Sequence, residues 1–165
     1  MKTPVRNVAY GDERGKMTLV SKTFELYGKT YTLESGELAK QATGSVLVKQ
    51  GDTTANVTVV VSKERKNYDF FPLTVDFIEK MYAVGRIPGG YLKREGRPSD
   101  KATLTARMID RPIRPSFPDG FRNEVHVVAT SLVADQVNPI DVICTMGASL
   151  AMTLGGVPFE GPLAC

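Results

Sequence analysis

Five short segments with the character of β-strands follow one another before any helical pattern occurs. They are rich in β-branched and aromatic residues and cover residues 23–26, 29–33, 45–49, 56–62 and 73–81. Turn residues separate them, notably at 27–29 and 50–52. Within the fourth segment Val57, Val59 and Val61 share one face of an extended chain, and the side chains between them share the other. This succession predicts a sheet whose early strands form a hairpin-like meander, with the fourth strand at least half buried.

Two helical segments are predicted in the second half of the chain. Ser99 is a suitable N-cap for a helix that begins near Asp100, and Pro112 limits the length of that helix. The Asn-Pro pair at 138–139 marks the start of a second helix, which ends at the glycine pair 155–156. Because this second helix is apolar on nearly all sides, we expect it to be buried against the sheet.

A further strand is predicted between the two helices, over residues 124–133. Val125 and Val127 lie on one face of this segment, and His126 and Val128 lie on the other. Strands first and helices afterwards favour an α+β (mixed α/β) domain, with a β-rich N-terminal half and helices packed on the sheet.

The composition excludes several classes of protein. The 165 residues are 42% hydrophobic and 24% charged, which is typical of a globular domain that needs no disulfide or structural metal. A single histidine and two distant cysteines leave no Cys/His zinc cluster. Residues 1–16 form a polar leader without signal-peptide character, and the ordered domain is expected over 17–165. No apolar run approaches the ~18 residues of a membrane helix, so we expect a cytoplasmic protein without membrane contact.

Basic residues are concentrated in one part of the chain. Between Arg86 and Arg122 there are nine basic and four acidic residues, in a chain whose formal net charge is only +3. This block indicates one site for an anionic partner. The alternative is a solvated face on which arginines pair with aspartates.

The segment 85–99 is too rich in glycine and proline to be a helix or a strand, and it is predicted to be a loop. Tyr91 offers an aromatic face for a base, and Lys93, Arg94 and Arg97 can meet phosphates. A glycine loop that combines cations with an aromatic side chain suits single-stranded nucleic acid. A plain surface loop is the alternative.

The residues that could carry catalysis have simpler structural explanations. His126 is interpreted as a residue on a strand face, and Asp141 as a first-turn residue of the second helix. The other carboxylates are scattered, and neither glycine-rich nucleotide-binding motif is present. We therefore assign no catalytic residue and no metal ligand.

Five motifs carry a resemblance to a known family. They are Asp-Phe-Phe-Pro-Leu-Thr-Val at 69–75, Gly-Arg-Ile-Pro-Gly at 85–89, Arg-Glu-Gly-Arg-Pro-Ser at 94–99, Arg-Met-Ile-Asp-Arg-Pro-Ile-Arg-Pro at 107–115 and Gln-Val-Asn-Pro at 136–139. In this unbroken order the chain closely resembles the first ribonuclease PH-like domain of the bacterial polynucleotide phosphorylases, from about residue 22 to 162.

The resemblance implies a phosphate-dependent 3′-to-5′ exoribonuclease, a polyribonucleotide nucleotidyltransferase that acts in mRNA degradation. It also implies a homotrimeric ring, single-stranded RNA as partner, degradosome-type protein partners, and no DNA. Magnesium (Mg2+) and inorganic phosphate belong to a second domain in this family, so we expect neither to bind here. On this interpretation the chain is a truncated enzyme that ends within its first domain and is inactive alone.

The family's channel loop, Phe-Phe-Arg-Arg, falls on residues 91–94. Tyr91 keeps the aromatic face and Arg94 matches the family's arginine. Leu92 lacks a ring, and Lys93 supplies the compact charge of an ammonium in place of a planar guanidinium. Arg97 falls where single-domain relatives place a phosphate-contacting arginine. The resemblance leads us to expect Asp110 to pair with neighbouring arginines. The alternatives are a non-catalytic RNA-binding or ring-scaffold module of the same fold and a single-domain ribonuclease PH-type exonuclease.

Overall fold

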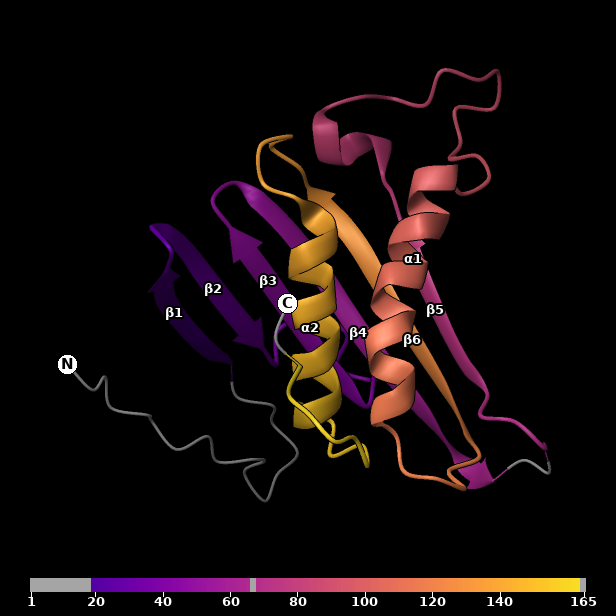
Figure 1. Cartoon of the computed structure of the whole chain (residues 1–165). Helices are drawn as coiled ribbons and strands as arrows, with labels where there is room; N and C mark the ends of the chain where they lie inside the picture. The colour runs from indigo at the N-terminus through magenta and orange to yellow at the C-terminus, as the bar shows by residue number, and fades with distance from the viewer. Residues whose placement is uncertain (1–18, 66–67, 164–165) are drawn as a thin grey trace.

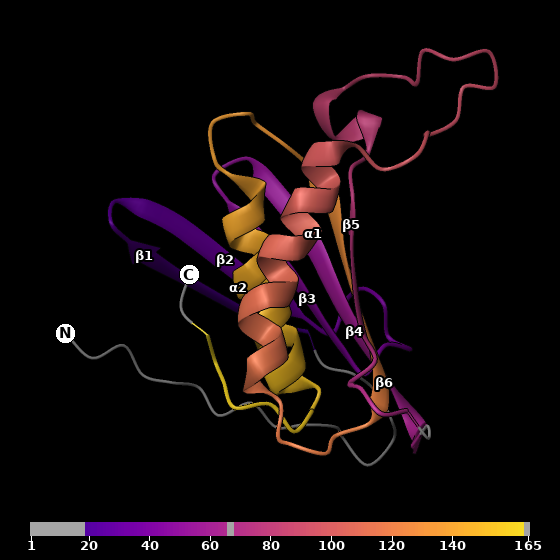
Figure 2. The same cartoon turned by 45° about the vertical axis from the view of Figure 1, so that its right-hand side comes forward.

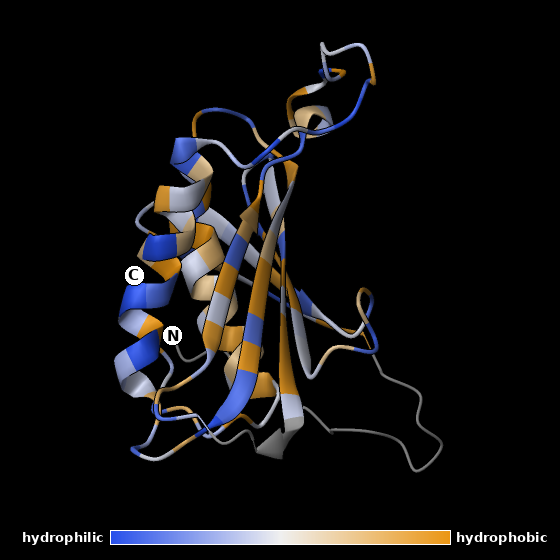
Figure 3. Ribbon diagram, turned by 90° about the vertical axis from the view of Figure 1, so that its right-hand side faces the viewer, coloured by the Kyte–Doolittle hydropathy of each residue, from blue (hydrophilic) through white to orange (hydrophobic). Residues whose placement is uncertain are grey.

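A computed structural model describes residues 19–65 and 68–163, and within them one sheet carries two helices on the same face (Figures 1 and 3). The strands are β1 (Val20–Leu26), β2 (Lys29–Ser35), β3 (Gly44–Gln50), β4 (Thr53–Arg65), β5 (Leu73–Ile78) and β6 (Asn123–Val133). The helices are α1 (Asp100–Ile113) and α2 (Ile140–Leu154), with short 3-10 turns η1 (Met81–Val84) and η2 (Arg114–Ser116). The predicted leader, residues 1–16, lies outside the described residues.

The strand order in the sheet is β1-β2-β3-β4-β6-β5. The pairs β1–β2, β2–β3, β3–β4 and β4–β6 are antiparallel, and β5 and β6 are parallel. The hairpin between β1 and β2 turns on Tyr27 and Gly28, whose φ angles of 50° and 69° are those of a two-residue primed turn. The parallel pair needs a crossover, which contains α1. The predicted mixed fold is confirmed.

The core lies between the helices and the central strands. Val57 and Val59 of β4 are fully buried, whereas Val60 between them is 49% exposed, as the alternation predicted. Helix α2 packs on β3 and β4 and buries Ile143, Cys144, Ala148, Ala151 and Met152. It lies close against the sheet at Gly147, where a Cβ would lie 2.8 Å from a methyl of Val57. The second predicted helix is therefore buried against the sheet.

Several predicted boundaries differ from the structure by a few residues: β1 begins three residues before the predicted segment, and β4 extends three residues beyond it at each end. The fifth strand was predicted to reach residue 81, but β5 ends at Ile78 and the chain turns into η1. The turn is fixed by a distant contact, because the amide of Ala134 donates to the carbonyl of Ala83 at 2.9 Å. Pro112 lies inside the last turn of α1, which ends one residue later. Its missing N–H removes one helical hydrogen bond, but the helical pattern continues to the amide of Arg114, which donates to the carbonyl of Asp110.

Candidate nucleic-acid interface

The glycine-rich segment 85–99 is a long loop that projects beyond the end of the sheet, between η1 and α1 (Figures 1 and 2). Every residue from 89 to 99 is exposed. The loop therefore contributes nothing to the core, and its composition has to be explained by something other than packing.

The tip of the loop is a tight turn that presents two apolar side chains to solvent. The amide of Lys93 donates to the carbonyl of Gly90 at 3.0 Å, and Lys93 itself has a φ of 50°. Tyr91 and Leu92 occupy the centre of this turn and are 98% and 71% exposed. Both faces of the Tyr91 ring are thus open to a stacking partner.

The cations of the loop are not engaged by the domain. In the described residues, the side chains of Lys93, Arg94 and Arg97 make no hydrogen bond or ion pair. Arg114 behaves differently, because its guanidinium binds Asp110 at 2.8 Å and the carbonyl of Leu73 at 3.2 Å. The expected structural pairing of Asp110 is confirmed, but the alternative of internal Arg–Asp pairs does not account for the loop.

Side-chain hydrogen bonds join the two ends of the loop. We call this region, where residues 79–81 meet residues 95–99, the neck of the loop. The Ser99 hydroxyl accepts from the amide of Ala102 at 3.0 Å, so Ser99 caps α1 as predicted. The same hydroxyl donates to Glu79 Oε2 at 2.6 Å, and the amide of Met81 donates to Glu95 Oε1 at 2.9 Å.

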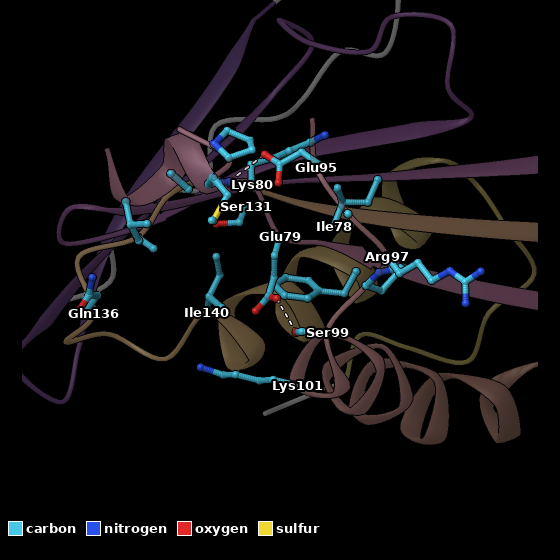
Figure 4. A pocket seen from close by; sticks show the side chains of 18 of the residues that line it. Ile78, Glu79, Lys80, Glu95, Arg97, Ser99, Lys101, Ser131, Gln136 and Ile140 are labelled. Atoms are coloured by element: carbon cyan, nitrogen blue, oxygen red, sulfur yellow. Dashed lines mark hydrogen bonds between the residues drawn. The ribbon is translucent and has the colours of Figure 1, made fainter. Parts of the chain in front are cut away.

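A cavity of about 1180 Å³ lies beneath the loop, between the end of β5 and the connection from β6 to α2. Its lining mixes charged, amide and apolar side chains, among them Glu79, Lys101, Ser131, Gln136 and Ile140 (Figure 4). Of the predicted site residues, Arg94 and Arg97 line this cavity, whereas Tyr91 and Lys93 do not. The structure thus places the four residues on one loop but gives them two different surroundings.

Sequence reasoning did not identify Glu79 and Glu95 as part of this site. Each is one of many scattered carboxylates, and each binds a group 14 or 20 residues away along the chain. The motif at 136–139 was a partial signal for the cavity, because Gln136 and Asn138 both line it.

Other candidate groups lie outside the loop. His126 is on the outer face of β6, where its Nε2 lies 2.8 Å from Asp76 Oδ2 on β5. Burial, with the nearby charge of Asp141, raises the pKa of the Cys144 thiol to about 12, so that thiol is not a nucleophile. Across residues 19–65 and 68–163 no cluster of three or more carboxylate, imidazole or thiolate groups could hold a metal ion. The described helices include none long and apolar enough to cross a membrane.

Comparison with known proteins identifies the fold family. The sequence pattern described as the 3′ exoribonuclease family, domain 1, matches residues 28–158. The chain belongs to this family. The match confirms the resemblance to a first ribonuclease PH-like domain and the fold expected from it.

The similar relatives are much longer than this chain. It is 58% identical over 142 residues to the polyribonucleotide nucleotidyltransferase of Heliobacterium modesticaldum, covering 86% of the chain and 20% of the relative. The enzyme of the same name from Bacillus cereus (strain AH187) is 56% identical with the same coverage. The chain therefore spans about a fifth of the length of the relatives that it matches.

Solved structures share the ribonuclease PH-like fold at low identity. The Archaeoglobus fulgidus exosome with RNA bound to the active site aligns at a TM-score of 0.54 and 22% identity, over 70% of this chain and 48% of that one. An archaeal exosome core aligns at 0.50 and 22%, over 70% and 44%. These matches concern the fold alone, whereas the higher identity to nucleotidyltransferases places the chain near that branch of the family.

Proposed function

We propose that the chain is the N-terminal part of a phosphate-dependent 3′-to-5′ exoribonuclease, a polyribonucleotide nucleotidyltransferase acting in mRNA degradation. Its loop 85–99 contacts single-stranded RNA in this proposal. The observation that carries it is the group of cations Lys93, Arg94 and Arg97, which have no partner among the described residues, on the same exposed loop as the ring of Tyr91. The family and the named relatives support the reaction class.

The chemistry of the loop suits RNA without a sequence preference. A base stacked on Tyr91 contributes about 1–3 kcal/mol whatever its identity. Lys93 and Arg94 neutralise phosphates and release counterions, so binding should weaken as the salt concentration rises. Leu92 offers no ring, so Tyr91 is the stacking platform at the tip of the loop.

The phosphorolytic centre lies outside this chain in the proposal. The carboxylates of the described residues do not fit a magnesium site, since no three of them cluster. Residues 17–165 would then be part of one domain of a cytoplasmic, homotrimeric enzyme, whose magnesium and phosphate are held elsewhere. Degradosome-type partners would also bind outside the segment described here.

The test is fluorescence anisotropy of a short labelled single-stranded RNA across a salt series. We expect the Lys93→Ala/Arg94→Ala variant to bind more weakly than wild type, with a salt slope smaller by about 0.7 for each lost phosphate contact. The control is Lys22→Ala/Lys29→Ala, which removes the same charge from the exposed β1–β2 hairpin. Failure of wild type to bind, or equal effects of the two variants, would overturn the proposal.

A further inference from the structure

The two limbs of loop 85–99 are joined across its neck by two carboxylates. Glu95, in the second half of the loop, accepts a hydrogen bond from the Met81 amide, and Glu79 before the loop accepts one from the hydroxyl of Ser99, the last residue of the loop (Figure 4). The residues joined are 14 and 20 positions apart. These contacts bring the entrance and the exit of the loop together.

The incoming limb is fixed to the body of the domain. Ala83 in η1 is 6% exposed, and its carbonyl accepts from the amide of Ala134 at 2.9 Å. The amide of Arg86 donates to the carbonyl of Met81 at 3.0 Å. Met81 therefore offers its own amide from a rigid position.

The part of the loop that leads to α1, the outgoing limb, makes few hydrogen bonds to the rest of the domain. Among the described residues, the bond from Met81 to Glu95 is the hydrogen bond that ties segment 87–98 to the rest of the chain. The other bond in this segment, from Lys93 to Gly90, lies within the tip. Because the segment is almost wholly exposed, apolar packing does not compensate.

The negative charge of Glu95 does not suit direct contact with RNA. A carboxylate next to Arg94 repels the phosphates that the loop is proposed to bind. Its side chain makes no ion pair within the described residues, so charge balance does not explain it. What it does provide is an acceptor for a backbone amide that no other described group satisfies.

We propose that Glu95 and Glu79 are positioning residues that hold the loop closed at its neck and thereby aim Arg94 and Arg97 over the cavity. They act on RNA through the shape of the loop and not by contact. This inference rests on the proposed function of the loop. Glu79 works through Ser99, so the cap of α1 and the neck of the loop share one hydroxyl.

The test compares two variants of equal charge, Glu95→Gln and Glu95→Ala. Both remove one negative charge, but glutamine keeps an oxygen that can accept from Met81. We expect the amide of Met81 to exchange with solvent roughly three- to tenfold faster in Glu95→Ala than in Glu95→Gln. We expect RNA affinity to fall by a similar factor between Gln and Ala, with an unchanged melting temperature. For Glu79, which accepts from Ser99, we likewise expect RNA affinity to fall between Glu79→Gln and Glu79→Ala.

The two readouts separate the inference from the function on which it rests. Equal exchange of the Met81 amide in the Gln and Ala variants would overturn the proposal that Glu95 holds the loop closed, whether or not RNA binds. A difference in exchange with equal RNA affinity would overturn the aiming of Arg94 and Arg97. Failure of wild type to bind RNA would overturn the proposed function. The exchange of the Met81 amide would still test whether Glu95 holds the loop closed.

Discussion

The arginines of the basic block differ in what already occupies their guanidinium groups. Arg114 binds Asp110 and two backbone carbonyls, so its donors are largely used within the domain. Arg94 and Arg97 have no such partners among the residues described. Since a guanidinium has five donors, a free one on an exposed loop is available to a phosphate, whereas Arg114 stabilises the junction of α1 and β5.

Asp135 is a residue whose charge stabilises the fold. Hydrogen bonds from the amide of Asn138, the hydroxyl of Thr53 and the amide of Val137 hold the pKa of its carboxyl well below its ordinary value of 3.8. A carboxyl with a lowered pKa in the folded state contributes stability above the unfolded pKa and loses it as the pH falls. We expect Asp135→Ala to be clearly less stable than wild type at pH 7, and the difference to shrink below about pH 4.

Urea unfolding at a series of pH values measures this effect. The exposed Asp119 is a matched control, because Asp119→Ala removes the same charge from a site where the structure gives the carboxylate no partner. A stability difference for Asp135→Ala that did not depend on pH would contradict the role of its charge.

At the scale of elements, the strands, the helices and the meander of β1 to β4 follow from the sequence, but the place of β6 in the sheet does not. Alternation located β4 and β6, β-rich composition between turn residues located β3, and capping signals located the start of α1 and both ends of α2. The insertion of β6 between β4 and β5 has no local signal, because it depends on pairing across more than 50 residues. The early end of β5 was missed for the same reason, since Ala134 fixes η1 from a distance.

The contact of α2 with the sheet leaves no room at Gly147. A Cβ there would lie 2.8 Å from Val57 and 2.9 Å from Val48, both fully buried. We expect Gly147→Ala to destabilise the domain by about 1–3 kcal/mol, because the helix must move away from a close-packed core. Denaturant unfolding measures this. Gly89→Ala is the control, since a Cβ at Gly89 meets nothing within 4 Å. Equal stabilities of the two variants would contradict the close approach.

At the scale of the whole molecule, the loop that we propose to bind RNA and a cluster of aromatic rings lie at opposite ends of the sheet. The loop 85–99 projects from one end of the sheet (Figure 1). At the other end Phe71 packs on Phe117 with ring centroids 4.6 Å apart, and Phe121 and Phe159 extend this cluster. Variants of the loop can therefore be tested without unfolding the domain.

The site could be predicted from the sequence only in part. Tyr91, Lys93, Arg94 and Arg97 were found from composition, because cations and an aromatic on a glycine loop carry their own signal. Their two environments, and the carboxylates at the neck, depend on how distant segments meet. Such contacts join residues that are 14 or 20 positions apart, so no local sequence pattern predicts them.

The chain by itself is expected to release no nucleoside diphosphates from RNA. The proposal places phosphate and magnesium outside it, and no three carboxylates cluster in residues 19–65 and 68–163. Incubation of the purified chain with single-stranded RNA, inorganic phosphate and Mg²⁺, followed by chromatography of the nucleotides, tests this. Release that required phosphate would show that the chain holds a phosphorolytic centre after all.

Because β6 lies between β4 and β5, the sheet cannot be completed until β6 has been synthesised. Strand β4 ends at Arg65, yet its second neighbour begins only at Asn123. Throughout the synthesis of the intervening residues, β4 presents unpaired backbone groups on one of its edges, and β5 lacks the strand with which it pairs. The sheet is then completed from its middle instead of at an edge, so a nascent chain that stalls before β6 is a substrate for chaperones and for aggregation.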